Sequence, residues 1–166
     1  IAFFLTAVLG TGGQAVGWLG AASSLFSFFG GILYGHFSRR NQFKKIAIGN
    51  YFLFFSGFLL LGLARSWVPV IVGELILGFC MGLNNANLAN WLSNVVDVQV
   101  RGRANGIYAT LMSLGPFTAP FFFAPVILNW DYSAAFVTSA FIFGLMGLAG
   151  LFIRIREPNQ SMENRT

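Results

Sequence analysis

Residues 68–96 read VPVIVGELILGFCMGLNNANLANWLSNVV, and this apolar segment holds one acidic side chain, that of Glu74, and no basic one. A helix needs about 20 residues to cross the ~30 Å hydrocarbon core of a membrane, so the segment is longer than one crossing requires. It lacks the strict alternation of apolar and polar residues that marks a strand of a membrane barrel. The segment therefore predicts a membrane-spanning helix that is tilted or protrudes from the lipid.

Four more segments are long enough to cross a membrane, at residues 15–37, 46–63, 104–128 and 134–153. Residues 1–9 are too few for a crossing. We interpret them as the end of a truncated helix, because the sequence opens inside an apolar run without Met or a basic leader. Residues 157–166 are polar and predict a tail. The predicted fold class is all-α, a polytopic membrane bundle over residues 1–156.

The basic residues predict the orientation of this bundle. Of the ten Lys and Arg residues, only Arg65 falls in a turn on one side of the predicted spans. The others fall on the opposite side, at Arg39, Arg40, Lys44, Lys45, Arg101, Arg103, Arg154, Arg156 and Arg165. Cytoplasmic loops carry an excess of Lys and Arg. We therefore expect a multi-pass protein of the cell membrane, of the bacterial inner-membrane kind, with a cytoplasmic C-terminus.

The composition argues against several classes of protein. The chain is 56% hydrophobic and only 9% charged, whereas a soluble domain carries about 25% charged residues. Its net charge of +5 belongs to residues that flank apolar spans, so we expect a lipid bilayer as partner and no nucleic acid. One His, one Cys and five acidic residues predict no metal cluster, and no P-loop occurs. Neither an enzyme nor a cofactor is expected.

Small residues and prolines indicate how the helices pack. Glycines spaced as GxxxG let membrane helices approach closely, and they occur at Gly13–Gly17, Gly31–Gly35 and Gly78–Gly82. In residues 104–128, three prolines each remove a backbone donor and favour a kink. Gly115, Pro116 and Pro120 therefore mark the predicted bent and moving helix.

The loop after the first complete span carries a recognisable motif. Residues 31–40 read GILYGHFSRR, which resembles the G-x-L-a-D-r-x-G-r-[RK] loop of the major facilitator superfamily. Gly31, Leu33, Arg39 and Arg40 match, whereas Gly35 stands at the acidic position. A second signature follows: GLNN at residues 82–85, VRGRANG at 100–106 and LGPF at 114–117 resemble helix ten, its cytoplasmic loop and helix eleven of such transporters.

The resemblance implies a fold of two six-helix bundles around a central cavity with a midplane substrate site. Residues 1–9 would then end helix seven, and the complete spans would be helices eight to twelve, the C-terminal half of a transporter whose N-terminal half is missing from the sequence. The spacing of Gly106, Gly115 and Ala119-Pro120 is similar to the family's antiporter motif, which implies export.

Glu74 is the predicted proton-coupling residue, because charge at membrane depth is costly and such residues face a bundle interior or water. The alternatives are that it reaches the outer interface or pairs with Arg65. Asn84, Asn85, Asn87 and Trp91 are the predicted substrate-cavity residues. At 100° per residue, Asn84, Asn87, Asn90 and Asn94 share one sector of the helix, which must face protein or the cavity. Hydrogen bonding between helices is the alternative role for these amides.

Arg39, Arg40, Arg101 and Arg103 are predicted to act in the cytoplasmic loops, because loops of this kind brace the helices in one access state of the family. The alternative is that they only orient the chain. The leading hypothesis is proton-coupled, alternating-access transport of a small organic solute, with export the expected direction. A non-transporting receptor or assembly subunit is a different class, and a short chain acting as a homodimer is a third reading.

Overall fold

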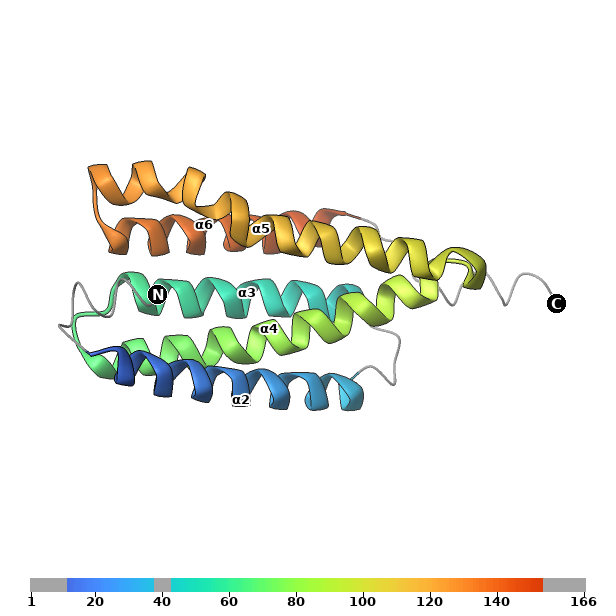
Figure 1. The fold of residues 1–166 in the computed structure, drawn as a ribbon, viewed down its shortest axis with the longest axis horizontal. Helices are drawn as coiled ribbons and strands as arrows, with labels where there is room; N and C mark the ends of the chain where they lie inside the picture. Colours follow the sequence, from blue (N-terminus) through green and yellow to red (C-terminus); the bar gives the residue numbers. More distant parts are fainter. Residues whose placement is uncertain (1–11, 38–42, 154–166) are drawn as a thin grey trace.

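Five long helices make up the part of the chain that the computed structural model describes, residues 12–37 and 43–153. All five are long and apolar enough to cross a membrane, and no strand occurs in these two ranges. The prediction of an all-α membrane bundle is therefore confirmed. In chain order the elements are α2 (Gly13–Phe37), α3 (Phe43–Gly62), α4 (Trp67–Val95), the short 3-10 helix η2 (Val98–Val100), α5 (Arg101–Asn129) and α6 (Tyr132–Phe152), shown in Figure 1. The predicted partial helix 1–9 and the tail 157–166 lie outside the described residues, as do Arg39 and Arg40.

Two helices extend further toward their basic ends than the sequence pattern predicts. α3 begins at Phe43 rather than at residue 46, and α5 begins at Arg101 rather than at residue 104. Apolar length measures only the part of a helix inside the hydrocarbon core. Long basic side chains place their charged ends in the headgroup layer, so a helix continues through Lys44 and Lys45 without burying charge in lipid.

α4 is the central helix of the packed group. It packs against α2 on one side and α3 on the other, and α3 in turn packs against α6 (Figure 1). The buried core lies along this row of helices, at Leu19, Phe54, Leu61, Val70, Leu77 and Cys80. α5 makes only sparse contacts with α6 and α4, and none of its residues is buried within the described part of the chain. The row α2, α4, α3 and α6 is thus the packed group of helices, and α5 contacts it only sparsely.

Glycines allow the backbones of α2 and α4 to touch. A methyl group at Gly78 would overlap the Ser23 carbonyl, and one at Gly82 would overlap the Ser27 carbonyl. The predicted close packing at Gly78–Gly82 is therefore confirmed. Around Gly13–Gly17 and Gly31–Gly35, by contrast, no described atom lies within 4 Å of the position a methyl group would take. The spacing alone does not tell which face of its helix a glycine pair occupies.

Stacked aromatic rings join α3 to α6. The rings of Phe54 and Phe143 lie 4.8 Å apart between centroids, and those of Phe58 and Phe143 lie 5.3 Å apart. Such pairs contribute about 0.5–1.5 kcal/mol beyond the area they bury. Phe54 and Phe58 also line a cavity among α2, α3 and α4. The stack therefore fixes one wall of that cavity by anchoring it to α6.

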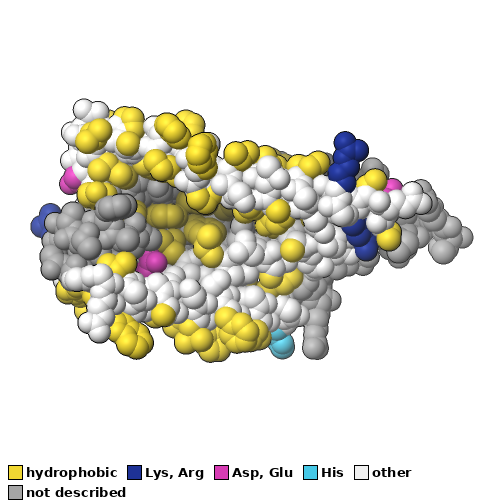
Figure 2. All heavy atoms as spheres, in the orientation of Figure 1, with side chains coloured by type: hydrophobic (Ala, Val, Ile, Leu, Met, Phe, Trp, Pro, Cys, Tyr) yellow, Lys and Arg dark blue, Asp and Glu magenta, His cyan; other side chains and the backbone are white. Residues whose placement is uncertain are grey.

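The described basic residues divide between the two ends of the bundle. Lys44 and Lys45 lie in the first turn of α3, and Arg101 and Arg103 lie in the first turn of α5. The α6 C-terminus is at the same end, because Lys44 Nζ donates a hydrogen bond of 3.4 Å to the Leu151 carbonyl. On the face drawn in Figure 2, apolar side chains cover the length of the bundle and basic ones appear only near its ends. This arrangement is that of a bundle immersed in lipid along its length.

The α2–α4 contact predicts a test of stability. Gly82→Ala places a methyl group against the Ser27 backbone and forces the helices apart, so we expect a loss of about 1–3 kcal/mol in the free energy of unfolding, as for an overpacked core. Unfolding of the purified protein by a graded denaturing detergent measures this loss. Gly20→Ala is the matched control, because no described atom lies within 4 Å there. Equal stability of the two variants would contradict the contact.

Candidate functional site

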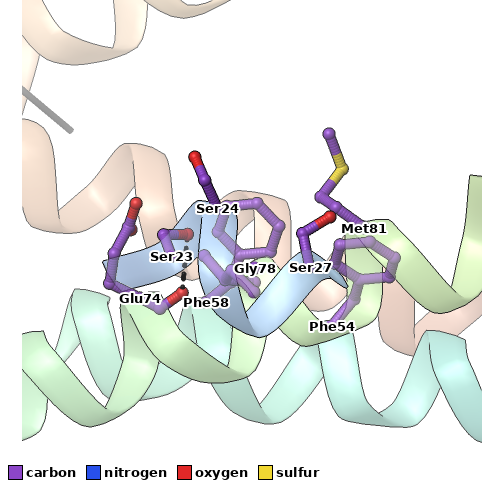
Figure 3. A pocket seen from close by; sticks show the side chains of 9 residues that line it. Ser23, Ser24, Ser27, Phe54, Phe58, Glu74, Gly78 and Met81 are labelled. Atoms are coloured by element: carbon purple, nitrogen blue, oxygen red, sulfur yellow. Dashed lines mark hydrogen bonds between the residues drawn. The ribbon is translucent and has the colours of Figure 1, made fainter. Parts of the chain in front are cut away.

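A cavity of about 400 Å³ opens among α2, α3 and α4 and contains the carboxylate of Glu74. We call it the Glu74 cavity, and its chemically informative lining residues are Ser23, Ser24, Ser27, Phe54, Phe58 and Glu74. Figure 3 shows the side chains of Ser24, Ser27 and Glu74 extending to the same side, while the Ser23 hydroxyl turns toward the Glu74 backbone. A volume of this size is within the range of about 300–1,000 Å³ that small-molecule sites occupy.

The serines lie at the cavity because α2 needs small side chains where it crosses α4. Ser23 Oγ donates a hydrogen bond of 3.3 Å to the Glu74 carbonyl, which ties the two helices together beside the Gly78 contact (Figure 3). Ser24 Oγ donates within α2, to the Gly20 carbonyl at 2.8 Å. A serine hydroxyl also has lone pairs that accept, so both side chains present hydrogen-bond acceptors to the cavity.

Glu74 is the acidic group among the described lining residues. Its side chain is half-buried, and its Oε2 is buried without a hydrogen-bond partner in the described ranges. No ion pair joins it to Arg65 in the described chain, where Arg65 is exposed at the end of the bundle. A buried acceptor left unpaired costs about 1–3 kcal/mol, and more when it is charged. The site therefore favours a proton or a ligand that supplies a donor to this oxygen.

The predicted amide residues of α4 do not join Glu74. Asn84 is half-buried and Asn85 is exposed, while Asn87 and Trp91 line a second cavity. Asn87 Nδ2 donates to the Phe43 carbonyl of α3 at 3.2 Å. Asn90 Nδ2 donates to the Tyr34 hydroxyl of α2 at 2.9 Å. These two amides hydrogen-bond between helices, in line with the alternative role that the sequence leaves open for them.

The second cavity lies among α3, α4 and α6 and measures about 160 Å³. We call it the Lys44 cavity, and the lining residues that matter below are Lys44, Ile48, Tyr51, Asn87, Leu88 and Trp91. It shares no lining residue with the Glu74 cavity. The structure thus separates residues that the sequence pattern groups on one helix into two distinct places.

Arg101 and Arg103 are exposed at the start of α5, and Arg101 Nε donates to the Val96 carbonyl at 3.2 Å. This bond spans the turn between α4 and α5. Asp97 is exposed, and the described residues contain no ion pair between it and either arginine. In the described part of this loop, the Arg101 side chain is therefore hydrogen-bonded to the end of α4.

α5 remains one continuous helix through Pro116, Pro120 and Pro125. The Thr118 hydroxyl donates to the Leu114 carbonyl at 2.9 Å and to the Gly115 carbonyl at 3.2 Å. The carbonyls that lack a backbone donor because of the three prolines are those of Met112, Pro116 and Phe121, four residues before each proline, so the Thr118 bonds do not replace the missing ones. The predicted kink positions Gly115, Pro116 and Pro120 thus lie in an uninterrupted but weakened helix, whose path bends in Figure 1.

The sequence reasoning missed Ser23, Ser24 and Ser27 as site residues. The available signal was three hydroxyl residues within five positions of an otherwise apolar span. Polar residues in such spans face the bundle interior or a cavity rather than lipid. Only the packing of α2 on α4 shows that they line the same cavity as Glu74.

Comparison with known proteins agrees with this architecture. The sequence profile described as Major Facilitator Superfamily matches residues 1–166. A facilitated trehalose transporter Tret1 of Apis mellifera ligustica is 32% identical over 51% of this chain and 17% of its own length. Tret1 of Drosophila mojavensis is 29% identical over 73% of the chain and 14% of its own length. Sugar transport protein 12 of Arabidopsis thaliana is 31% identical over 67% of the chain and 22% of its own length.

The chain therefore spans less than a quarter of the length of each of these relatives. No solved structure matches. The profile covers the whole chain, the described part is a bundle of membrane-length helices, and the relatives are named as transporters rather than enzymes. On these grounds the chain belongs to the major facilitator superfamily.

Proposed function

We propose that this chain is the C-terminal bundle of a secondary transporter that moves a small organic solute across a membrane by alternating access. The observation that carries the proposal is the Glu74 cavity, a solute-sized space with a half-buried carboxylate between helices long enough to span the lipid. A charge is costly at that depth and is retained where it binds an ion or a solute.

The cavity chemistry supports a polar solute. The hydroxyl oxygens of Ser23 and Ser24 offer acceptors, Ser27 adds a third hydroxyl, and Phe54 and Phe58 contribute apolar surface. A few placed polar groups on an apolar lining are what fix the orientation of a small ligand. The names of the relatives favour a sugar as the solute class, and the hydroxyl-rich wall is compatible with that class.

Proton coupling at Glu74 is the second part of the proposal. A carboxyl group can lose its charge by taking a proton, which removes the cost of an unpaired buried oxygen. Protonation and deprotonation of Glu74 would then favour different access states of the bundle. Export as the direction of transport rests on the spacing of Gly106, Gly115 and Ala119-Pro120.

The exposed apolar surface of α5 favours the presence of a second bundle that packs against it. The helix carries exposed apolar residues along its length, including Phe117, Phe121 and Phe122, and none of its residues is buried in the described part of the chain. An N-terminal half of the same transporter would rock against this side, with the Arg101 and Arg103 turn, and the Arg39 and Arg40 loop, bracing the helices on the cytoplasmic face.

A receptor or assembly subunit that keeps the bundle without transporting is the second candidate. It would retain the packing of α2, α4, α3 and α6 but would gain nothing from an unpaired carboxylate in a cavity. Solute movement into sealed vesicles that contain the intact protein separates the two candidates.

Glu74→Gln should reduce proton-driven solute accumulation in such vesicles at least tenfold, because an amide cannot take up and release a proton. Exchange of labelled for unlabelled solute, which needs no net proton movement, should persist. Asp97→Asn is the matched control, since it makes the same chemical change at an exposed position outside the cavity. Proton-driven accumulation at the normal level in the Glu74 variant would refute proton coupling at this residue.

The proposed orientation predicts the labelling of the two ends of α4. Ser66→Cys and Val98→Cys place thiols at exposed positions before and after this helix, while native Cys80 is buried. In intact cells, a membrane-impermeant maleimide should label the Ser66 variant and reach the Val98 variant only after permeabilisation. The reverse pattern would invert the topology.

A further inference from the structure

The Lys44 cavity is a second polar site, separate from the one that the proposed function uses. It lies at the end of the bundle where α3 begins and α6 ends, which is the level of the lipid headgroups if the helices span the membrane. Its volume of about 160 Å³ corresponds to roughly five water molecules at ~30 Å³ each. It is below the range of about 300–1,000 Å³ that drug-sized ligands fill, so the occupant is a small polar group.

Lys44 provides the cation of this site. Its Nζ donates to the Leu151 carbonyl at 3.4 Å, in the last turn of α6. The C-terminal end of a helix carries partial negative charge, which attracts an ammonium group. Because an ammonium has three N–H donors, this single bond leaves donors for an anion in the cavity. This bond directs the Lys44 ammonium toward the C-terminus of α6, beside the cavity.

Asn87 provides an unused acceptor. The side chain is only 6% exposed, and its Nδ2 donates to the Phe43 carbonyl at 3.2 Å. Its Oδ1 is buried without a hydrogen-bond partner in the described chain, although the residue lines the cavity. An unpaired amide oxygen costs about 1–3 kcal/mol when buried. A hydrogen-bond donor on an occupant of the cavity would recover that cost.

The other residues that line the cavity are of the types found at a membrane interface. Ile48 and Leu88 are apolar, and Tyr51 and Trp91 are half-buried aromatic residues with a polar atom each. Tyr and Trp are enriched at the headgroup level of membranes, where one end of the ring is apolar and the other wet. The cavity thus combines a cation, a buried acceptor and an amphipathic aromatic lining at one depth.

We propose that the Lys44 cavity binds the headgroup of an anionic glycerophospholipid, with its phosphodiester on the Lys44 ammonium and a headgroup hydroxyl donating to Asn87 Oδ1. Phosphate is the anion available at this depth, and a glycerol headgroup supplies the hydroxyl. The lipid would join the start of α3 to the end of α6 through Lys44. The proposal does not depend on transport.

The neighbouring lysine gives the site a matched control. Lys45 carries the same charge one residue further along, but it is exposed and lines a different, largely apolar surface hollow between α3 and α4. A general attraction of basic residues to anionic lipid would depend equally on both lysines. Specific binding in the cavity would depend on Lys44 and not on Lys45.

Fluorescence of Trp91 reports on occupancy, because this residue lines the cavity. The intact protein is reconstituted in phosphatidylcholine bilayers that contain increasing fractions of a lipid with bromines high on its acyl chains, which quench nearby tryptophan. The quenching that is absent from a Trp91→Phe variant is assigned to Trp91. The brominated lipids compared are phosphatidylglycerol, phosphatidylmethanol with the same charge but no headgroup hydroxyl, and phosphatidylcholine.

We expect brominated phosphatidylglycerol to saturate the Trp91 component at a fraction at least tenfold lower than phosphatidylcholine, with phosphatidylmethanol between them. Lys44→Gln should abolish the preference, Lys44→Arg should restore it, and Lys45→Gln should leave it unchanged. Asn87→Leu should remove only the difference between phosphatidylglycerol and phosphatidylmethanol.

Three results would overturn the proposal. The first is equal quenching by all three lipids in the unaltered protein. The second is an equal effect of the Lys44 and Lys45 substitutions, which would assign the preference to surface charge. The third is loss of the preference when soluble glycerophosphoglycerol is added at only the molar amount of the protein, because a free phosphodiester that displaces the far more abundant membrane lipid would be the occupant.

Discussion

The backbone contact between α2 and α4 determines where the rest of the structure can lie. Gly78 and Gly82 bring α4 against the carbonyls of Ser23 and Ser27, and Gly30 of α2 meets the backbone of Phe79 and Leu83 in return. Lipid tails are as apolar as the side chains, so packing rather than water exclusion must hold such helices together. A contact this close fixes the register of the two helices, and the Ser23 hydroxyl and the Glu74 backbone meet because of it.

Three buried side-chain oxygens in the described chain have no hydrogen-bond partner, and each belongs to a residue that lines a cavity. Glu74 lines the cavity beside the α2–α4 contact, Asn87 lines the Lys44 cavity, and Asn50 lines the hollow next to Lys45. The side-chain Nδ2 of Asn50 and that of Asn87 each donate a hydrogen bond to a backbone carbonyl of a neighbouring helix. Each amide therefore ties two helices together through its nitrogen, while its oxygen stays buried and unpaired beside the adjacent space.

The sequence predicts the helices well and the cavities poorly, for one physical reason. The length and charge of an apolar span depend on the lipid, which acts on each helix separately, so the crossings and their basic ends can be read from the chain alone. The lining of a cavity depends on how two helices face each other. The sector of asparagines on α4 illustrates this, because Asn87 contacts α3 while Asn90 contacts α2. A 120° sector of a central helix faces two neighbours at once, and the sequence pattern treats it as one face.

α5 differs from the other helices in what holds it. Each of Pro116, Pro120 and Pro125 lacks the amide hydrogen that would pair with the carbonyl four residues earlier, so the helix bends at lower cost than its neighbours do. The Thr118 hydroxyl bonds within α5 and adds no contact to another helix. The packed row of α2, α4, α3 and α6 instead has glycine contacts, interhelical amides and stacked rings that a bend would break. The free-energy cost of a change of shape is therefore lowest in α5, because this helix packs least against the other four.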